Sequence, residues 1–244
     1  MTDERPGHAA GLRERKKRRT RDALLRAALL LFVSRGYERT TVDEITGAVD
    51  VSQRTFFRYF ANKEEVAFAV QELVESHFVA VLRARPAAEG PFRALRNAVL
   101  DTWDTLDEAI SELVPVDLYL RTYRLIERTP ALLAVHLRRS TELEERIARL
   151  IAEREGLDVD ADPRPRVAVA AFSGVMRVTG RLWGQGEDAS VAAIRGMTEA
   201  HLDRIGPALA ADWPRSAPAA AGRRPGLTRP VRPSDGEEGS HGRP

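Results

Sequence analysis

The segment from Ser52 to Phe60 holds the side chains whose types and spacing most readily suggest chemistry. It reads Ser-Gln-Arg-Thr-Phe-Phe-Arg-Tyr-Phe. Arginine can donate two hydrogen bonds to a guanine edge or a phosphate, and threonine and tyrosine hydroxyls bond phosphate oxygens. Exposed aromatic rings are otherwise hard to justify on a short surface helix. The alternative is a solvated amphipathic helix with incidental arginines, and these nine residues alone leave both interpretations open.

The residues around this segment predict short helices that hold it outward. Ser52 is a favourable N-cap, and a helix beginning there would bury Phe56 and Phe60 on one face, because they are four residues apart. Upstream, the run Thr41–Glu44 has the form of a capping box, which predicts another helix start. Asp50 lies where the chain must turn sharply, which predicts a positive φ. Two short helices joined by a three-residue turn form a helix-turn-helix.

Longer helices are expected on both sides of this unit. The apolar spacing predicts a first helix from about Thr20 to Arg35, ended by Gly36 in the left-handed conformation. A further helix should begin at Asn62 and stop at Pro86, with His77 buried and hydrogen-bonded on its apolar side.

Several short motifs at fixed spacing resemble the DNA-binding domain of the TetR family of transcriptional regulators. They are Gly36-Tyr37, Thr40-Thr41-Val42, Ile45, Val51-Ser52, Thr55 to Phe60 and Asn62-Lys63-Glu64. The resemblance covers about residues 20–68 and implies an all-helical fold, a dimer and a ligand pocket in the remaining two-thirds. The family usually has glycine where Asp50 stands, so the turn geometry of this chain departs from the family pattern. The family often has glycine where Arg54 stands, so Arg54 is expected to add a base or phosphate contact.

The expected DNA contacts come from this unit and from a basic arm. Residues 1–21 hold eight basic and three acidic side chains, which suggests phosphate contact, although a merely solubilising tail is the alternative. Arg54 and Phe57 are the candidates for base edges or flanking sugars. The remaining predicted DNA-binding residues are Arg18, Arg19, Thr41, Ser52, Gln53, Thr55, Arg58, Tyr59 and Lys63.

Large apolar and aromatic residues of the C-terminal part are candidates for the lining of an apolar ligand pocket, with plain core as the alternative for each. They are Trp103, Tyr119, Tyr123, Phe172 and Met176, with Trp183 as a further candidate, while Arg121, Arg124 and Arg177 could meet an anionic ligand. The run from Val49 to Glu65 is similar to a TetR subgroup that includes mycofactocin-type regulators. That similarity implies a small-molecule effector of the acyl-CoA type.

The stretch Arg166–Gly184 is apolar on more than one side and rich in small residues, so it must be covered on more than one side. With a final helix over Ala189–Leu209 it is expected to pair with its copy in a homodimer, as the family resemblance implies. The expected division is a disordered basic arm at 1–14, a helix-turn-helix domain at 15–68, a helical ligand-binding and dimerisation domain at 69–212 and a disordered tail at 213–244.

Composition limits the classes of protein to which the chain can belong. The chain has 244 residues, a formal net charge of +2 and no cysteine, which excludes disulfides, thiolate zinc sites and cysteine nucleophiles and fits the cytoplasm. No apolar run approaches the roughly 20 residues that span a bilayer. The sequence contains no enzyme motif or cofactor motif in a fitting context, and its histidines show no metal-binding spacing. The prediction is a ligand-responsive repressor that binds a palindromic double-stranded operator. The alternative is a helical ligand-binding or scaffold protein whose basic arm binds nucleic acid or a membrane surface non-specifically.

Overall fold

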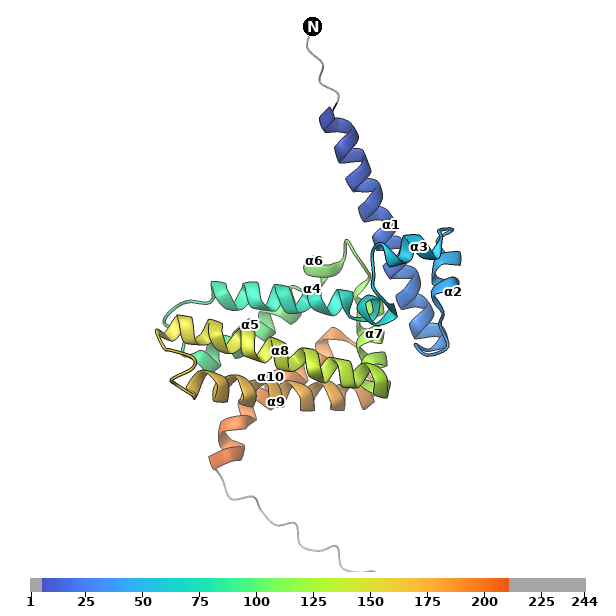
Figure 1. The fold of residues 1–244 in the computed structure, drawn as a ribbon. Coiled ribbons are helices and arrows are strands. Elements are labelled where there is room, and N and C mark those ends of the chain that lie inside the picture. Colours follow the sequence, from blue (N-terminus) through green and yellow to red (C-terminus); the bar gives the residue numbers. More distant parts are fainter. Residues whose placement is uncertain (1–5, 211–244) are drawn as a thin grey trace, which may run out of the picture. The chain divides into compact units, whose positions relative to one another are not determined.

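The computed structural model describes residues 6–210, and they form an all-α fold, as predicted, with no strand in that range. The helices are α1 (Pro6–Arg35), α2 (Val42–Gly47), α3 (Gln53–Phe57), α4 (Lys63–Ala84), α5 (Pro91–Asp104), α6 (Leu106–Ile110), α7 (Val116–Arg128), α8 (Pro130–Glu155), α9 (Arg164–Gln185) and α10 (Val191–Ala210) (Figure 1). The predicted tail at 213–244 lies outside the described residues.

Helix α1 begins at Pro6 instead of near Thr20, so the prediction of disorder was wrong for residues 6–14. Residues 12–19 are leucine, glutamate, lysine and arginine, all of which favour helix. Arg18 also forms an ion pair of 2.9 Å with Glu112, beyond the end of α6, which fixes this part of the helix against the rest of the protein.

Helices α1, α2 and α3 pack around a small core that holds the helix-turn-helix. Its fully buried side chains include Leu24, Phe32, Ile45, Phe56 and Phe60. The local start and stop signals act as predicted. Both hydrogen bonds of the capping box at Thr41–Glu44 are present, Gly36 ends α1 at φ +93°, and Asp50 has φ +54° in the turn between α2 and α3.

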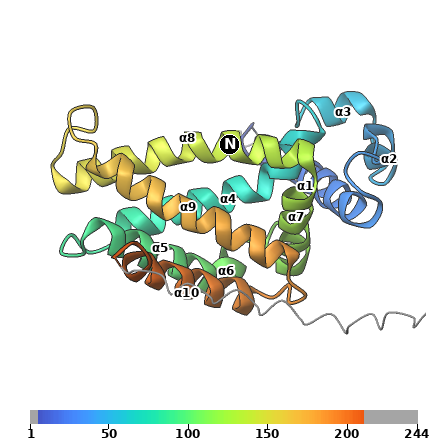
Figure 2. The ribbon, with the colours of Figure 1, turned by 90° about the horizontal axis from the view of Figure 1, so that it is seen from below.

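Helix α4 connects this unit to the larger helical bundle. It contacts α1 on one side and α5, α6, α7 and α8 on the other. Figures 1 and 2 both show α8 and α9 side by side, and these two helices make the most extensive helix–helix contact within residues 6–210. Helix α10 is tied to α5 by ion pairs from Arg96 to Asp203 (2.6 Å) and from Arg195 to Asp104 (2.6 Å).

Two leucines of α4 and α8 lie at the surface. Leu73 and Leu137 are 38% and 44% exposed. Polar Gln71 and His136 are buried, and Gln71 Nε2 lies 2.9 Å from His136 Nδ1, so each side chain gains a hydrogen-bond partner for one of its polar atoms. His77, predicted to be a hydrogen-bonded histidine, is partly buried with Nε2 2.8 Å from the hydroxyl of Thr105.

Candidate nucleic-acid interface and ligand cavity

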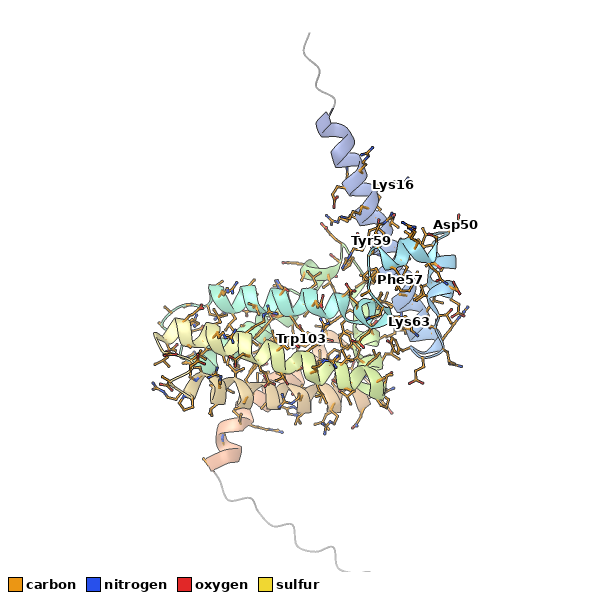
Figure 3. All side chains as sticks on the ribbon, in the orientation of Figure 1. Lys16, Asp50, Phe57, Tyr59, Lys63 and Trp103 are labelled. Carbon is orange, nitrogen blue, oxygen red and sulfur yellow. The ribbon has the colours of Figure 1, made fainter. Side chains whose placement is uncertain are left out.

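Helix α3 is held so that its cationic and aromatic side chains face away from the core. Ser52 caps it, because its hydroxyl oxygen accepts a hydrogen bond from the Thr55 amide at 3.3 Å. Burial of Phe56 on the inner face leaves Arg54 and Phe57 on the outside, and Phe57 is 53% exposed. Figure 3 marks Phe57 and Tyr59 at this part of the molecule.

The outward-facing residues of the motif differ in how many of their hydrogen-bond donors are already used within the protein. The guanidinium of Arg54 has no partner among the described side chains, which leaves its donors open to an external acceptor. Arg58 lies over the ring of Tyr59 at 4.9 Å and donates to its hydroxyl at 3.3 Å. Gln53 donates to Asp43 of α2, so it links the two short helices of the motif.

Two residues predicted to contact phosphate are engaged within the protein. Lys63 donates from Nζ to the backbone carbonyls of Tyr37 (3.0 Å) and Thr40 (2.6 Å) and lies 4.7 Å from the centre of the Tyr37 ring. It therefore fastens the turn between α1 and α2 to the start of α4. Arg18 is paired with Glu112, as described above, whereas Arg19 is exposed and has no partner in the described part of the chain.

The basic part of α1 lies beside the end of α3. Arg13, Lys16, Lys17 and Thr20 line one surface hollow together with Arg58 and Tyr59. The sequence predicted the arm and the recognition helix as separate contact regions. The structure joins them, because the arm is helical and Arg13, Lys16 and Lys17 line the same hollow as Arg58 and Tyr59.

The bundle holds a partly open cavity of about 160 Å³ between α4, α5, α7, α8 and α9. Six residues predicted to form the pocket all line it, namely Trp103, Tyr119, Tyr123, Phe172, Met176 and Arg177. Trp183 does not line it. Arg124 stacks on Trp183 at 4.7 Å and donates to the carbonyl of Asp188, and Arg121 pairs with Asp117, so neither arginine reaches the cavity.

Polar lining residues form a connected set that the sequence did not reveal. Gln71 Nε2 donates to Glu75 Oε1 at 3.0 Å and to His136 Nδ1 at 2.9 Å, which places the histidine proton on Nε2. Burial lowers the pKa of His136 to about 4 and raises the pKa of Glu75 above its ordinary value. Gln71, Glu75 and His136 form no recognisable sequence motif, because only the packing of α4 against α8 brings them together.

One face of α9 is apolar and exposed. Val167, Val178 and Leu182 are 65%, 50% and 46% exposed, and the small residues Ala171 and Gly174 lie between them on the same side of the helix. Solvent-facing apolar side chains in a row, separated by small residues that permit close approach, are typical of a helix that packs against a partner.

Two family models match the chain. Residues 24–70 match the bacterial regulatory proteins of the tetR family, and residues 89–210 match the MftR C-terminal domain. The HTH-type transcriptional regulator TcmR of Streptomyces glaucescens is 48% identical over 205 residues, which cover 84% of this chain and 91% of the relative.

The chain belongs to the TetR family. The predicted resemblance is confirmed, including its mycofactocin-regulator-like subgroup, since the C-terminal domain is of the MftR type. As a TetR-family member, the chain is a DNA-binding transcriptional regulator, and such regulators are generally not enzymes.

Solved structures support the TetR fold. The SmeT–triclosan complex matches with a TM-score of 0.55 at 21% identity, covering 78% of this chain and 90% of that one. NalD, the secondary repressor of the MexAB-OprM multidrug efflux pump in Pseudomonas aeruginosa, matches with a TM-score of 0.53 at 17% identity, covering 79% and 96%. At these identities the likeness shows the fold alone. None of the helices within residues 6–210 is long and apolar enough to cross a membrane.

Proposed function

We propose that this TetR-family regulator is a repressor that binds a palindromic operator as a homodimer and leaves it when a small apolar molecule fills the cavity. The observation that carries the proposal is the outward face of α3, where Arg54 and Phe57 stand exposed on a helix fixed by its caps and by buried Phe56. A helix presented in this way fits the major groove.

The proposed DNA contacts follow from two properties of each side chain, namely its exposure to solvent and its hydrogen bonds within the protein. Arg54 and Phe57 would meet base edges or flanking sugars, because they are exposed at the centre of the motif. The phosphates would be contacted by the remaining polar and basic residues, namely Arg19, Thr41, Ser52, Gln53, Thr55, Arg58 and Tyr59. Lys63 and Arg18 would contribute positive potential instead of a direct contact, since both are already bonded within the protein.

The proposed dimer uses α9 and α10 of both protomers. Burial of the exposed stripe of Val167, Val178 and Leu182 against a twin would remove apolar surface from water. Two α3 helices could then enter successive major grooves, roughly 34 Å or a multiple of it apart. The operator should therefore be an imperfect palindrome.

The proposed switch connects the cavity to the spacing of the two α3 helices. Helix α4 lines the cavity with Gln71, Val74 and Phe78 and also packs on α1, so a ligand that displaces α4 changes the position of the motif. A coupling of about 1–3 kcal/mol would change DNA affinity roughly 5–150-fold. The effector is proposed to be a small apolar compound, with acyl-CoA as the alternative to test in a thermal-shift panel of several chain lengths.

Binding of fluorescent duplexes tests the proposal. The wild-type protein should bind the region upstream of its own gene more tightly than a scrambled duplex at physiological salt. Arg54→Ala should lose about 1–3 kcal/mol of this binding. Arg83→Ala is the matched control, because Arg83 is exposed on α4 and has no partner in the described residues. Equal binding of native and scrambled duplexes, or a monomer at all concentrations, would refute the proposal.

A further inference from the structure

We propose that the cavity selects an uncharged, flat molecule that carries hydrogen-bonding oxygen groups, and that Trp103 and Gln71 anchor it. The inference rests on the proposed function in one respect, namely that the cavity takes a ligand. It goes further by assigning the chemical class of that ligand and the two side chains that recognise it.

The cavity walls favour a flat body. Phe78 and Phe172 stack with their ring centres 5.9 Å apart and an interplanar angle of 6°, and Trp103 and Tyr119 add further rings. Aromatic faces of this kind attract other flat π-systems through offset stacking. The volume of about 160 Å³ is close to that of an engineered protein cavity of roughly 150 Å³ that binds benzene. A one-ring core therefore fits this volume, and a second ring has room because the cavity is partly open.

Neutral polar groups of the lining lack partners. Trp103 Nε1 and Gln71 Oε1 are both buried without a hydrogen bond in the described part of the chain. A buried polar group left without a hydrogen bond destabilises the protein, because it has lost its water partners and gained none. A ligand that offers an acceptor to the indole N–H and a donor to the amide oxygen would remove both penalties after a small side-chain adjustment, whereas a hydrocarbon would leave them in place.

The arginine, histidine and glutamate side chains of the cavity lining are already bonded to other side chains of the protein, which disfavours an ionic ligand. Arg177 is the cation of the lining, and its Nη1 lies 2.5 Å from Glu144 Oε1. Burial keeps His136 neutral at pH 7 by lowering its pKa to about 4, and keeps Tyr119 and Tyr123 protonated by raising theirs. Glu75 accepts from Gln71, and burial raises its pKa. A carboxylate or phosphate would lose its hydration here without gaining a free cation.

Four probes of nearly equal size separate these effects on the full chain. They are naphthalene, 1-naphthol, 1-naphthoate and 1-naphthylmethylammonium, followed by thermal shift and tryptophan fluorescence. We expect 1-naphthol to bind best, with a Kd about five- to tenfold below that of naphthalene, because a single neutral hydrogen bond supplies roughly that factor. Both ions should bind more weakly than naphthalene. Tightest binding by either ion would overturn the proposal.

Trp103→Phe tests the indole anchor, since it removes the N–H and keeps an aromatic ring. The preference for 1-naphthol over naphthalene should shrink to less than twofold. Trp183→Phe is the matched control, because its Nε1 is also buried and unpaired but Trp183 does not line the cavity, and its preference should stay unchanged. Circular dichroism checks that both variants fold. An unchanged preference in Trp103→Phe, or an equal loss in both variants, would refute the assignment.

A duplex-release assay with 1-naphthol separates this inference from the proposed function. Preferred binding of 1-naphthol without any release of DNA would support the chemical class and refute ligand-driven release. Tight, sequence-dependent DNA binding with no response of the protein to any uncharged probe would refute the chemical class and leave the DNA-binding proposal standing.

Discussion

The guanidinium of Arg26 in α1 donates from Nε to the backbone carbonyl oxygen of Leu113 at 2.5 Å. A second hydrogen bond of 2.6 Å joins its Nη2 to the carbonyl oxygen of Glu112. These carbonyls belong to the segment between α6 and α7, and α7 brings Tyr119 and Tyr123 to the cavity. This side chain therefore adds hydrogen bonds to the packing of α1, which supports the DNA-binding motif, against α7, which lines the cavity.

Loss of this connection should weaken the response to an effector more than it weakens DNA binding. We expect Arg26→Gln to keep operator affinity within about threefold and to reduce the effector-induced change by about 1 kcal/mol, within the usual range of coupling energies. The measurement is the ratio of operator Kd values with and without a saturating probe. Arg83→Gln is the control, and an undiminished ratio in Arg26→Gln would show that the signal does not depend on this side chain.

Gly180 of α9 gives space to Tyr123. A Cβ at position 180 would overlap the Tyr123 hydroxyl and lie 3.4 Å from Cζ of its ring. Gly180→Ala should therefore lower the free energy of unfolding by about 1–3 kcal/mol through overpacking, measured by urea denaturation. Adding Tyr123→Phe should restore part of the loss. Gly196→Ala in α10, where nothing lies within 4 Å, should instead be neutral or stabilising. The same loss in both single variants would contradict the explanation.

His136 makes stability depend on pH with a defined sign. Its folded pKa is about 4, while an exposed histidine titrates near 6.5. Between these pH values the unfolded chain binds a proton that the folded protein does not, so the free energy of unfolding falls as the pH is lowered through this window. Glu75 and Glu127 act in the opposite direction, because burial raises their pKa and their folded forms retain protons.

A variant isolates the contribution of the histidine. The difference in unfolding free energy between wild type and His136→Gln should change by on the order of 3 kcal/mol between pH 7 and pH 4, with the wild type losing more as the pH falls. Urea titrations at several pH values measure it. Parallel pH profiles for the two proteins would place the pH dependence elsewhere.

The exposed cations of α1 should appear in the salt dependence of DNA binding. Lys16 and Arg19 are exposed and have no side-chain partner in the described residues. If each neutralises one phosphate in both protomers of the bound dimer, Lys16→Ala/Arg19→Ala should reduce the slope of log K against log salt by about 3.6, at roughly 0.9 for each of the four contacts. Native and scrambled duplexes should lose affinity equally. A slope identical to that of wild type would exclude α1 from the interface.

Local signals allowed the helix-turn-helix to be predicted from sequence in detail. The capping residues Thr41, Ser52 and Asn62 each accept a hydrogen bond from the amide three residues further on, so the cap can be recognised from neighbouring residues in the sequence. Asp50 was recognisable for the same reason, since a tight turn between two caps requires the left-handed region. The aromatic residues of the cavity were recognisable as a group because few large rings occur in the C-terminal part.

What the sequence could not supply are contacts between helices that lie far apart along the chain. Lys63 looks like a phosphate ligand in its motif, and only the fold places the carbonyls of Tyr37 and Thr40 beneath its ammonium. The burial of Gln71 and His136 depends on their meeting across α4 and α8, sixty-five positions apart. The early start of α1 was missed because its charge was taken as evidence of disorder, whereas lysine, arginine and glutamate also favour helix.

The exposed stripe on α9 has a consequence for gene dosage. If a protomer must meet a twin before it can occupy a two-fold site, promoter occupancy follows the square of its abundance while most copies remain single. Halving the number of copies would then cut occupancy about fourfold, so that dilution by cell growth could relieve silencing without any inducer.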